Sequence, residues 1–167
     1  MTMDEVNALS PEAFVTRFGH LFEHSPWVTT AAAARRPFAV ERDMLAAARA
    51  VLDEAGEARQ LALLCAHPEL AGKAAIDETL TAESAAEQAS AGLNRLTAEE
   101  FALFHARNAA YRERFGFPFI ICVRLTNKAG ILDAMKTRLE NDRAAEFSTA
   151  LDEVMKIVGL RLKEALA

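Results

Sequence analysis

Recurring helix-start signals constrain the fold of this chain more than any other feature of its sequence. Ser10-Pro11 and Ser25-Pro26 each place a capping residue before a proline, which suits the first position of a helix. Thr97 and Glu100 form a capping-box pattern at another helix start. Apolar residues recur at helical spacing after these signals, and further helical patterns cover residues 41–54, 57–65, 81–93, 130–141 and 143–165. We therefore predict an all-α fold, one compact domain of about eight helices over residues 1–167.

The composition agrees with a helical protein of moderate size. Hydrophobic residues make up 51% of the chain, whereas glycine and proline number only 7 and 5, a balance that favours helices. The net charge is −5 and the basic residues are scattered, so a nucleic-acid partner is not expected. No apolar run has membrane-spanning length, and the first residues lack the pattern of a secretory signal. Cys65 and Cys122 lie in apolar runs, which predicts buried, reduced thiols and a cytoplasmic location.

The sequence FGFPFIICV, residues 115–123, interrupts the helical pattern. Its aromatic residues bracket Gly116 and Pro118, and a short β-branched run follows. We predict a short extended, buried segment near residues 117–123. Such a segment could form a rigid wall over a flat ligand, with free backbone groups for polar ring atoms, or it could be only a buried connection.

The sequence CAHPELAG, residues 65–72, places a histidine directly before a proline. A residue that precedes proline is pushed out of helical geometry, so His67 is predicted at or just past a helix end. Because the histidine pKa lies near physiological pH, His67 is the best single candidate for proton transfer. The alternative is a histidine that only caps the helix or is bonded in the core.

A polar helix face forms the next candidate. Ser84, Glu87 and Gln88 are three and four residues apart, so they project from one face of a helix with alanines around them. Glu87 could hold His67 in one orientation and tautomer, although the same face could be only a solvated polar stripe. Arg161 lies among apolar neighbours and needs a carboxylate partner, either a protein glutamate or an anionic substrate.

The sequence HLFEH, residues 20–24, matches a zinc-protease pattern with two histidines four residues apart. Ser25-Pro26 follows at once, which puts His24 at a helix junction rather than within a helix. The chance-match interpretation is therefore preferred over a metal site built on His20 and His24.

Five segments occur together in one order, and their combination resembles a known family. They are FEHSPWV (22–28), AHPELAG (66–72), SAAEQASAGL (84–93), FGFPFI (115–120) and RLEN (138–141). This set resembles the 2-oxo-4-hydroxy-4-carboxy-5-ureidoimidazoline (OHCU) decarboxylases, which complete the breakdown of urate to (S)-allantoin. The resemblance extends from about Phe14 to Leu162. It implies an all-α homodimer that acts on a small anionic ureidoimidazoline and needs no metal or organic cofactor.

The resemblance also implies roles for individual residues. His67 matches the catalytic histidine, Glu87 matches its acidic partner, and Arg161 resembles the arginine near the C-terminus of the family. The positions that match the substrate-binding segments are Pro68, Ser84, Ala85, Ala86, Glu87, Gln88, Phe119, Ile120, Ile121, Cys122 and Val123. The competing class is a non-catalytic helical binding module, which predicts no turnover and no sensitivity to His67.

Overall fold

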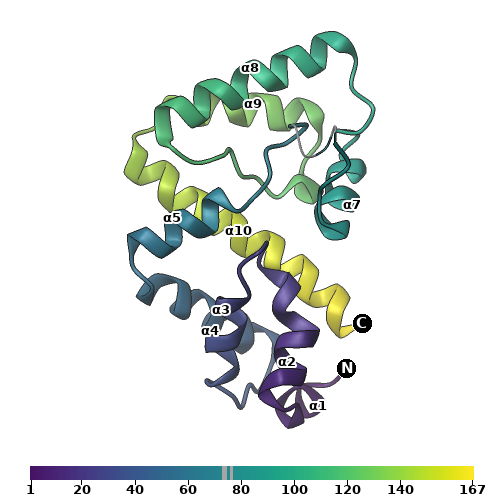
Figure 1. Ribbon diagram of the computed structural model, residues 1–167, viewed down its shortest axis with the longest axis vertical. Helices are drawn as coiled ribbons and strands as arrows, with labels where there is room; N and C mark the ends of the chain where they lie inside the picture. Colours follow the sequence, from purple (N-terminus) through teal and green to yellow (C-terminus); the bar gives the residue numbers. More distant parts are fainter. Residues whose placement is uncertain (73–74, 76) are drawn as a thin grey trace. The chain divides into compact units, whose positions relative to one another are not determined.

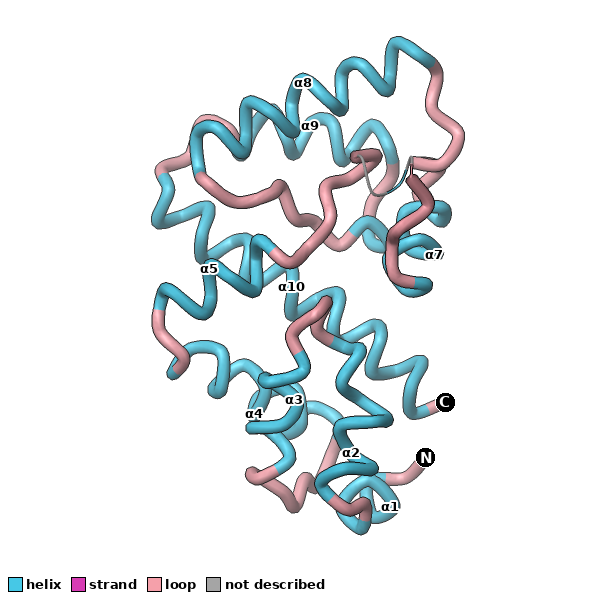
Figure 2. The backbone as a smooth tube through the Cα atoms, in the orientation of Figure 1, coloured by secondary structure: helices cyan, strands magenta, loops and turns pink. Residues whose placement is uncertain are grey.

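The computed structural model describes residues 1–72, 75 and 77–167. Throughout this part of the chain the backbone is helical or lies in turns and loops, with no strand (Figures 1 and 2). The predicted all-α fold is thereby confirmed. The backbone contacts divide the chain into two compact units, one of Met1–Ala66 with Met155–Ala167 and one of His67–Val154.

The first unit contains the N-terminal helices and the end of the C-terminal helix. Its helices are α1 (Met3–Ala8), α2 (Pro11–Phe18), η1 (Gly19–Leu21), α3 (Pro26–Ala33), α4 (Glu41–Glu54) and α5 (Glu57–Cys65), followed by the second part of α10 (Arg143–Leu166). Helix α3 packs against both α2 and α4. The core of this unit includes Phe14, Phe18, Val28, Leu52 and Leu162, all completely buried.

The second unit is built around a long helix and an aromatic core. It contains α7 (Ala82–Ser90), α8 (Ala98–Phe115), η2 (Val123–Leu125), α9 (Lys128–Arg138) and the first part of α10. Helices α8 and α9 lie side by side (Figure 1), and α7 packs against η2. The buried aromatic residues Tyr111, Phe115, Phe117 and Phe119 fill the space between α8 and the segment that follows it.

Local sequence signals account for most helix ends. Ser10 and Thr97 cap α2 and α8 as predicted, and α4 and α5 have the predicted bounds. Pro26 is the first residue of α3, but Ser25 is buried in an irregular conformation and forms no capping bond. Helix α1 was not predicted, although a capping box of Thr2 and Glu5 marks its start.

The sequence also predicts a loop over residues 66–80. Residues 66–72 and 77–80 do form turns and irregular backbone, but Ala75 is helical, which the loop prediction missed. Lys73, Ala74 and Ile76 lie outside the described residues. Across the described chain, no helix combines the length and the apolar character that crossing a membrane requires.

Candidate active site

His67 lies just past the end of a helix, as the following proline predicts. Helix α5 ends at Cys65, Ala66 is its C-terminal cap, and His67 and Pro68 begin the loop that follows. The side chain of His67 is buried, with only 8% of its surface exposed, and its Nε2 atom is closed to solvent. A histidine with a restrained backbone and a buried ring can transfer protons in a fixed direction.

Three side chains from two helices of the same unit hold the loop after His67. The amide of Gln88 accepts a hydrogen bond from Ala71 N (3.0 Å) and donates one to the Glu69 carbonyl (3.4 Å). Asn108, which is buried in α8, donates to the Leu70 carbonyl (2.8 Å). One turn further along α8, Arg112 forms an ion pair with the Glu69 carboxylate (3.0 Å). These bonds fix the backbone on the C-terminal side of His67.

Helix α7 buries two of its polar residues and exposes most of its alanines. Thr81 caps the helix by accepting a bond from Ser84 N (3.3 Å). Ser84 and Gln88 are buried and Glu87 is half-buried, whereas Ala85 and Ala86 are exposed. The predicted polar face of Ser84, Glu87 and Gln88 therefore exists, and it is turned toward the interior of the unit. Gln88, one of its members, already uses both ends of its amide on the loop after His67.

The segment after α8 is largely buried and has no regular secondary structure, and Cys122 near its end is extended (φ −73°, ψ 92°), whereas Val123, the last residue of the predicted extended segment, already belongs to η2. Gly116 ends α8 in the left-handed conformation (φ 81°), and irregular backbone continues to η2, which begins at Val123. Tyr111 contacts the ring of Phe119 edge-on, with ring centroids 5.2 Å apart, and the guanidinium of Arg138 lies 4.4 Å from the centre of the same ring. Of the five predicted pocket residues 119–123, only Ile121 is partly exposed.

Cys122 connects this segment electrostatically with α7. Burial raises the pKa of the Cys122 thiol, and the carboxylates of Glu153 and Glu87 raise that pKa further. Helix α7, which carries Glu87, also packs against η2, which begins at Val123, so the structure brings together two parts of the predicted site. The predicted burial of Cys122 is confirmed. The predicted burial of Cys65 is wrong, because Cys65 is exposed on α5 while Leu63 and Leu64 point into the core.

Arg161 belongs to the first unit, where it is buried and paired with a protein carboxylate. Its Nη1 atom lies 3.0 Å from Glu23 Oε2, and the same atom donates to the His20 carbonyl (3.3 Å). Both charged side chains of this pair are 2% exposed. The glutamate of the HLFEH pattern is therefore engaged with Arg161. His20 lies in η1 and His24 in a turn with positive φ (49°), so these two histidines do not share one face of a continuous helix.

A cavity of about 590 Å³ lies beside α7 in the second unit, within the usual size range for small-molecule sites. Two predicted substrate-binding residues, Ala85 and Gln88, line this cavity together with Leu93 and Phe101.

Several polar residues around the site were not singled out from the sequence. They are Asn108 and Arg112 on the loop after His67, and Tyr111, Glu146 and Glu153 around the extended segment. One signal was available for Glu146, because it lies four residues before Ala150 and eight before Val154, on the apolar stripe of α10. A carboxylate on such a stripe must find a partner in the core.

The fold and this site define an all-helical protein in which a buried histidine follows a helix end, and in which the unit that begins with this histidine holds a polar helix face and a buried aromatic segment. Residues 7–163 match the family model of the OHCU decarboxylases. The chain belongs to the OHCU decarboxylase family.

Similar proteins with known names support this membership over nearly the whole chain. The chain is 42% identical to the OHCU decarboxylase of Haloferax volcanii, covering 98% of this chain and 95% of the relative. It is 43% identical to that of Amia calva, covering 99% and 95%. A crystal structure of (S)-allantoin synthase matches with a TM-score of 0.79 and 28% identity over 99% of this chain, which spans 54% of that longer chain. A structure of OHCU decarboxylase in the presence of (S)-allantoin matches with a TM-score of 0.66 and 25% identity, covering 83% of this chain and 89% of that one.

Proposed function

We propose that this chain is a carboxy-lyase that converts OHCU to (S)-allantoin and carbon dioxide in urate breakdown, with His67 as its acid and base. Membership of the family over residues 7–163 supports the reaction. The observation that carries the role of His67 is its placement: a buried ring directly after a helix end, in a loop whose backbone is fixed by Gln88 and Asn108.

For this reaction the protein has to hold the substrate in position, stabilise its charges and deliver a proton to one face of its ring. The substrate carries a carboxylate and a hydroxyl on the same ring carbon, beside a C=N bond. When the bond to the carboxylate breaks, carbon dioxide leaves and the electron pair of this bond forms a C=C bond to the ureido-bearing carbon. The electrons of the C=N bond move onto the ring nitrogen, which takes up a proton from solvent. The hydroxyl then gives up its proton and becomes a carbonyl, while the neighbouring carbon, which bears the ureido group, takes up a proton.

In this scheme His67 accepts the hydroxyl proton and delivers a proton to one face of the ring, which sets the handedness of the product. Glu87 would orient His67 and bind ring or ureido N–H groups, because a half-buried carboxylate accepts such bonds well. Pro68 and Phe119 would enclose the ring, and Ser84, together with backbone groups of residues 120–123, would bind its polar atoms. The resemblance further assigns Arg161 a contact with a substrate carboxylate or carbonyl oxygen.

The activity is tested by generating the substrate enzymatically in the assay mixture. Urate is oxidised with urate oxidase, hydroxyisourate hydrolase is added, and the product is followed by circular dichroism with and without this protein. We expect fast growth of the (S)-allantoin signal with the wild-type chain, and at least a ~100-fold loss of rate in His67→Asn, in line with the usual contribution of a general acid or base.

The matched control for this variant is His105→Asn, which makes the same substitution at an exposed histidine of α8. We expect it to keep wild-type activity. A wild-type trace no faster than the spontaneous decay would reject the decarboxylase proposal and favour a helical binding module. Full activity in His67→Asn would reject only the role of this residue.

Two further expectations come with the family resemblance, a homodimer and a cytoplasmic location. Light scattering of the purified chain tests the first, since a dimer has twice the chain mass of 18.2 kDa.

A further inference from the structure

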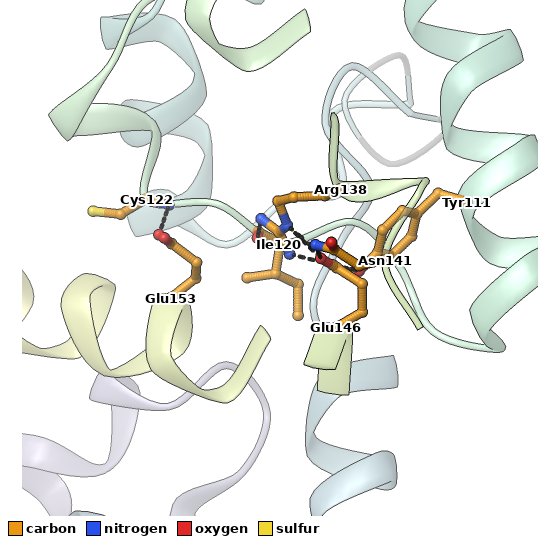
Figure 3. A network of polar contacts seen from close by, with 7 residues as sticks. All are labelled: Tyr111, Ile120, Cys122, Arg138, Asn141, Glu146 and Glu153. Carbon is orange, nitrogen blue, oxygen red and sulfur yellow. Dashed lines mark hydrogen bonds and ion pairs between the residues drawn. The ribbon is translucent and has the colours of Figure 1, made fainter. Parts of the chain in front are cut away.

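The extended segment that forms part of the proposed site is held at two alternate residues by charged side chains. Arg138 Nη1 donates to the carbonyl of Ile120 (2.7 Å), and Glu153 Oε2 accepts from the N–H of Cys122 (2.9 Å) (Figure 3). These two side chains come from α9 and α10, which follow the segment in the chain. One residue, Ile121, lies between the two anchored positions.

The side chain of Arg138, which holds the Ile120 carbonyl, is itself held in place inside the second unit. Its guanidinium Nε lies 3.0 Å from Glu146 Oε2 and 3.2 Å from Oε1, and Glu146 is completely buried. Glu146 also accepts hydrogen bonds from Tyr111 and from Asn141 Nδ2 (3.0 Å). Burial and the bond to Glu146 raise the pKa of Tyr111, so its phenol stays protonated and remains a donor. A buried network with this many bonds leaves Arg138 little freedom to move.

Arg138 and Glu153 bind residues 120 and 122, and this spacing determines which backbone groups between them remain available to a ligand. Cys122 is extended (φ −73°, ψ 92°), and in extended backbone the N–H and C=O of one residue point to the same side, whereas those of the next residue point to the other side. Ile120 and Cys122 use their bonded groups on Arg138 and Glu153, so this alternation directs the peptide groups of Ile121 away from both side chains. Within the described residues, no hydrogen bond engages the N–H or C=O of Ile121, and its side chain is the partly exposed one in the segment.

We propose that Arg138 and Glu153 are positioning residues that set the orientation of residues 120–122, so that the N–H and C=O of Ile121 are presented together to the substrate. A donor and an acceptor side by side complement the edge of a cyclic urea or lactam, which carries a C=O next to an N–H. The ring of OHCU has such edges. This inference rests on the proposed decarboxylase function and adds two residues that act through the backbone without touching the substrate.

Glu153 is the better residue for a test, because it is half-buried whereas Arg138 and Glu146 belong to the core. Glu153→Ala removes the acceptor for the Cys122 N–H, and Glu153→Gln keeps an acceptor oxygen at the same reach. Glu113→Ala, at an exposed glutamate of α8, is the matched control.

We expect Glu153→Ala to raise KM about 10-fold and to lower kcat/KM by about 10- to 100-fold, because a small misplacement of a binding group has effects of this size. Glu153→Gln should return both constants to within about threefold of wild type, and Glu113→Ala should leave them unchanged. A general loss of structure would lower the active fraction and kcat without raising KM, so the KM change and the rescue by glutamine separate positioning from folding.

A second measurement follows the backbone directly. The wild-type chain is labelled with ¹⁵N and titrated with (S)-allantoin, and we expect the Ile121 amide resonance to move more than that of Cys122. In Glu153→Ala the Cys122 amide should exchange with solvent faster, and the response of Ile121 should weaken.

The outcomes separate the inference from the function on which it rests. Wild-type kinetics in Glu153→Ala, with an active wild-type chain, overturn the positioning role alone. A Glu153→Gln variant as impaired as Glu153→Ala also overturns it, because the acceptor oxygen would not be what matters. An inactive wild-type chain overturns the proposed function and, with it, this inference.

Discussion

Removal of Glu146 tests how much the buried network of the second unit contributes to stability. Glu146 is 0% exposed and accepts bonds from Arg138, Asn141 and Tyr111. Glu146→Ala leaves the guanidinium of Arg138, which is only 9% exposed, without its carboxylate. At the 3.0 Å separation of this pair, the lost attraction is about 5 kcal/mol for an effective dielectric constant of about 20.

The net effect is smaller than the lost attraction, because the carboxylate no longer has to be desolvated. Breaking a buried pair by removing one partner typically costs about 3–5 kcal/mol. We therefore expect Glu146→Ala to lower the free energy of unfolding by about 3–5 kcal/mol. For a chain of 167 residues this corresponds to a fall in Tm of about 6–20 °C.

Urea unfolding followed by circular dichroism measures this change, with Glu113→Ala as a control expected within about 0.5 kcal/mol of wild type. Replacing both partners, as in Arg138→Met with Glu146→Leu, should recover much of the loss, because apolar side chains of similar volume avoid the unpaired charge. A cost below about 1 kcal/mol for Glu146→Ala would refute the reasoning, since the pair would then not be a desolvated one.

Two other predictions concern the thiols and a helix end. Iodoacetamide at pH 7 should modify exposed Cys65 at least about 10-fold faster than Cys122, as measured by mass spectrometry of peptides, because burial and the raised pKa keep Cys122 as an unreactive thiol. Raising the pH to 8.5 should still leave Cys122 largely unmodified, since the ionised form that reacts appears only above its raised pKa; equal rates at the two cysteines would contradict this. Gly116→Ala should cost about 1–2 kcal/mol in urea unfolding, because Gly116 has φ 81° and a Cβ there would meet no atom within 4 Å, so the cost is that of the backbone alone. The control Gly159→Ala, inside α10 with only an ordinary contact to Leu45, should stabilise by about 0.5–1 kcal/mol; a neutral Gly116→Ala would disprove the conformational argument.

Local signals in the sequence were sufficient for the helices and for the position of His67. Capping residues and apolar spacing act within a few positions of each other, so Ser10 and Thr97 predict the starts of α2 and α8, and apolar spacing predicts the bounds of α4 and α5. Pro68 restricts the residue before it, which places His67 past the end of α5. Gly116 and Pro118 likewise mark the end of α8 and the start of the extended segment.

The same local reasoning was wrong where burial depends on direction around a helix. Cys65 belongs to the apolar run that ends α5, but only one stripe of a helix faces the core, and Leu63 and Leu64 occupy it. The apolar character of a run does not by itself say which of its members is buried.

By itself, then, the sequence determined the all-α class, most of the helix ends, the placement of His67 and the family resemblance. Only the tertiary structure decided what holds the site. Gln88 reaches the loop after His67 across 17 residues of chain, Asn108 across 38, and Glu153 reaches Cys122 across 31. The physical reason is that such bonds form between segments distant in sequence, which no local preference brings together. They exist because packing of the second unit buries polar groups that must then find partners.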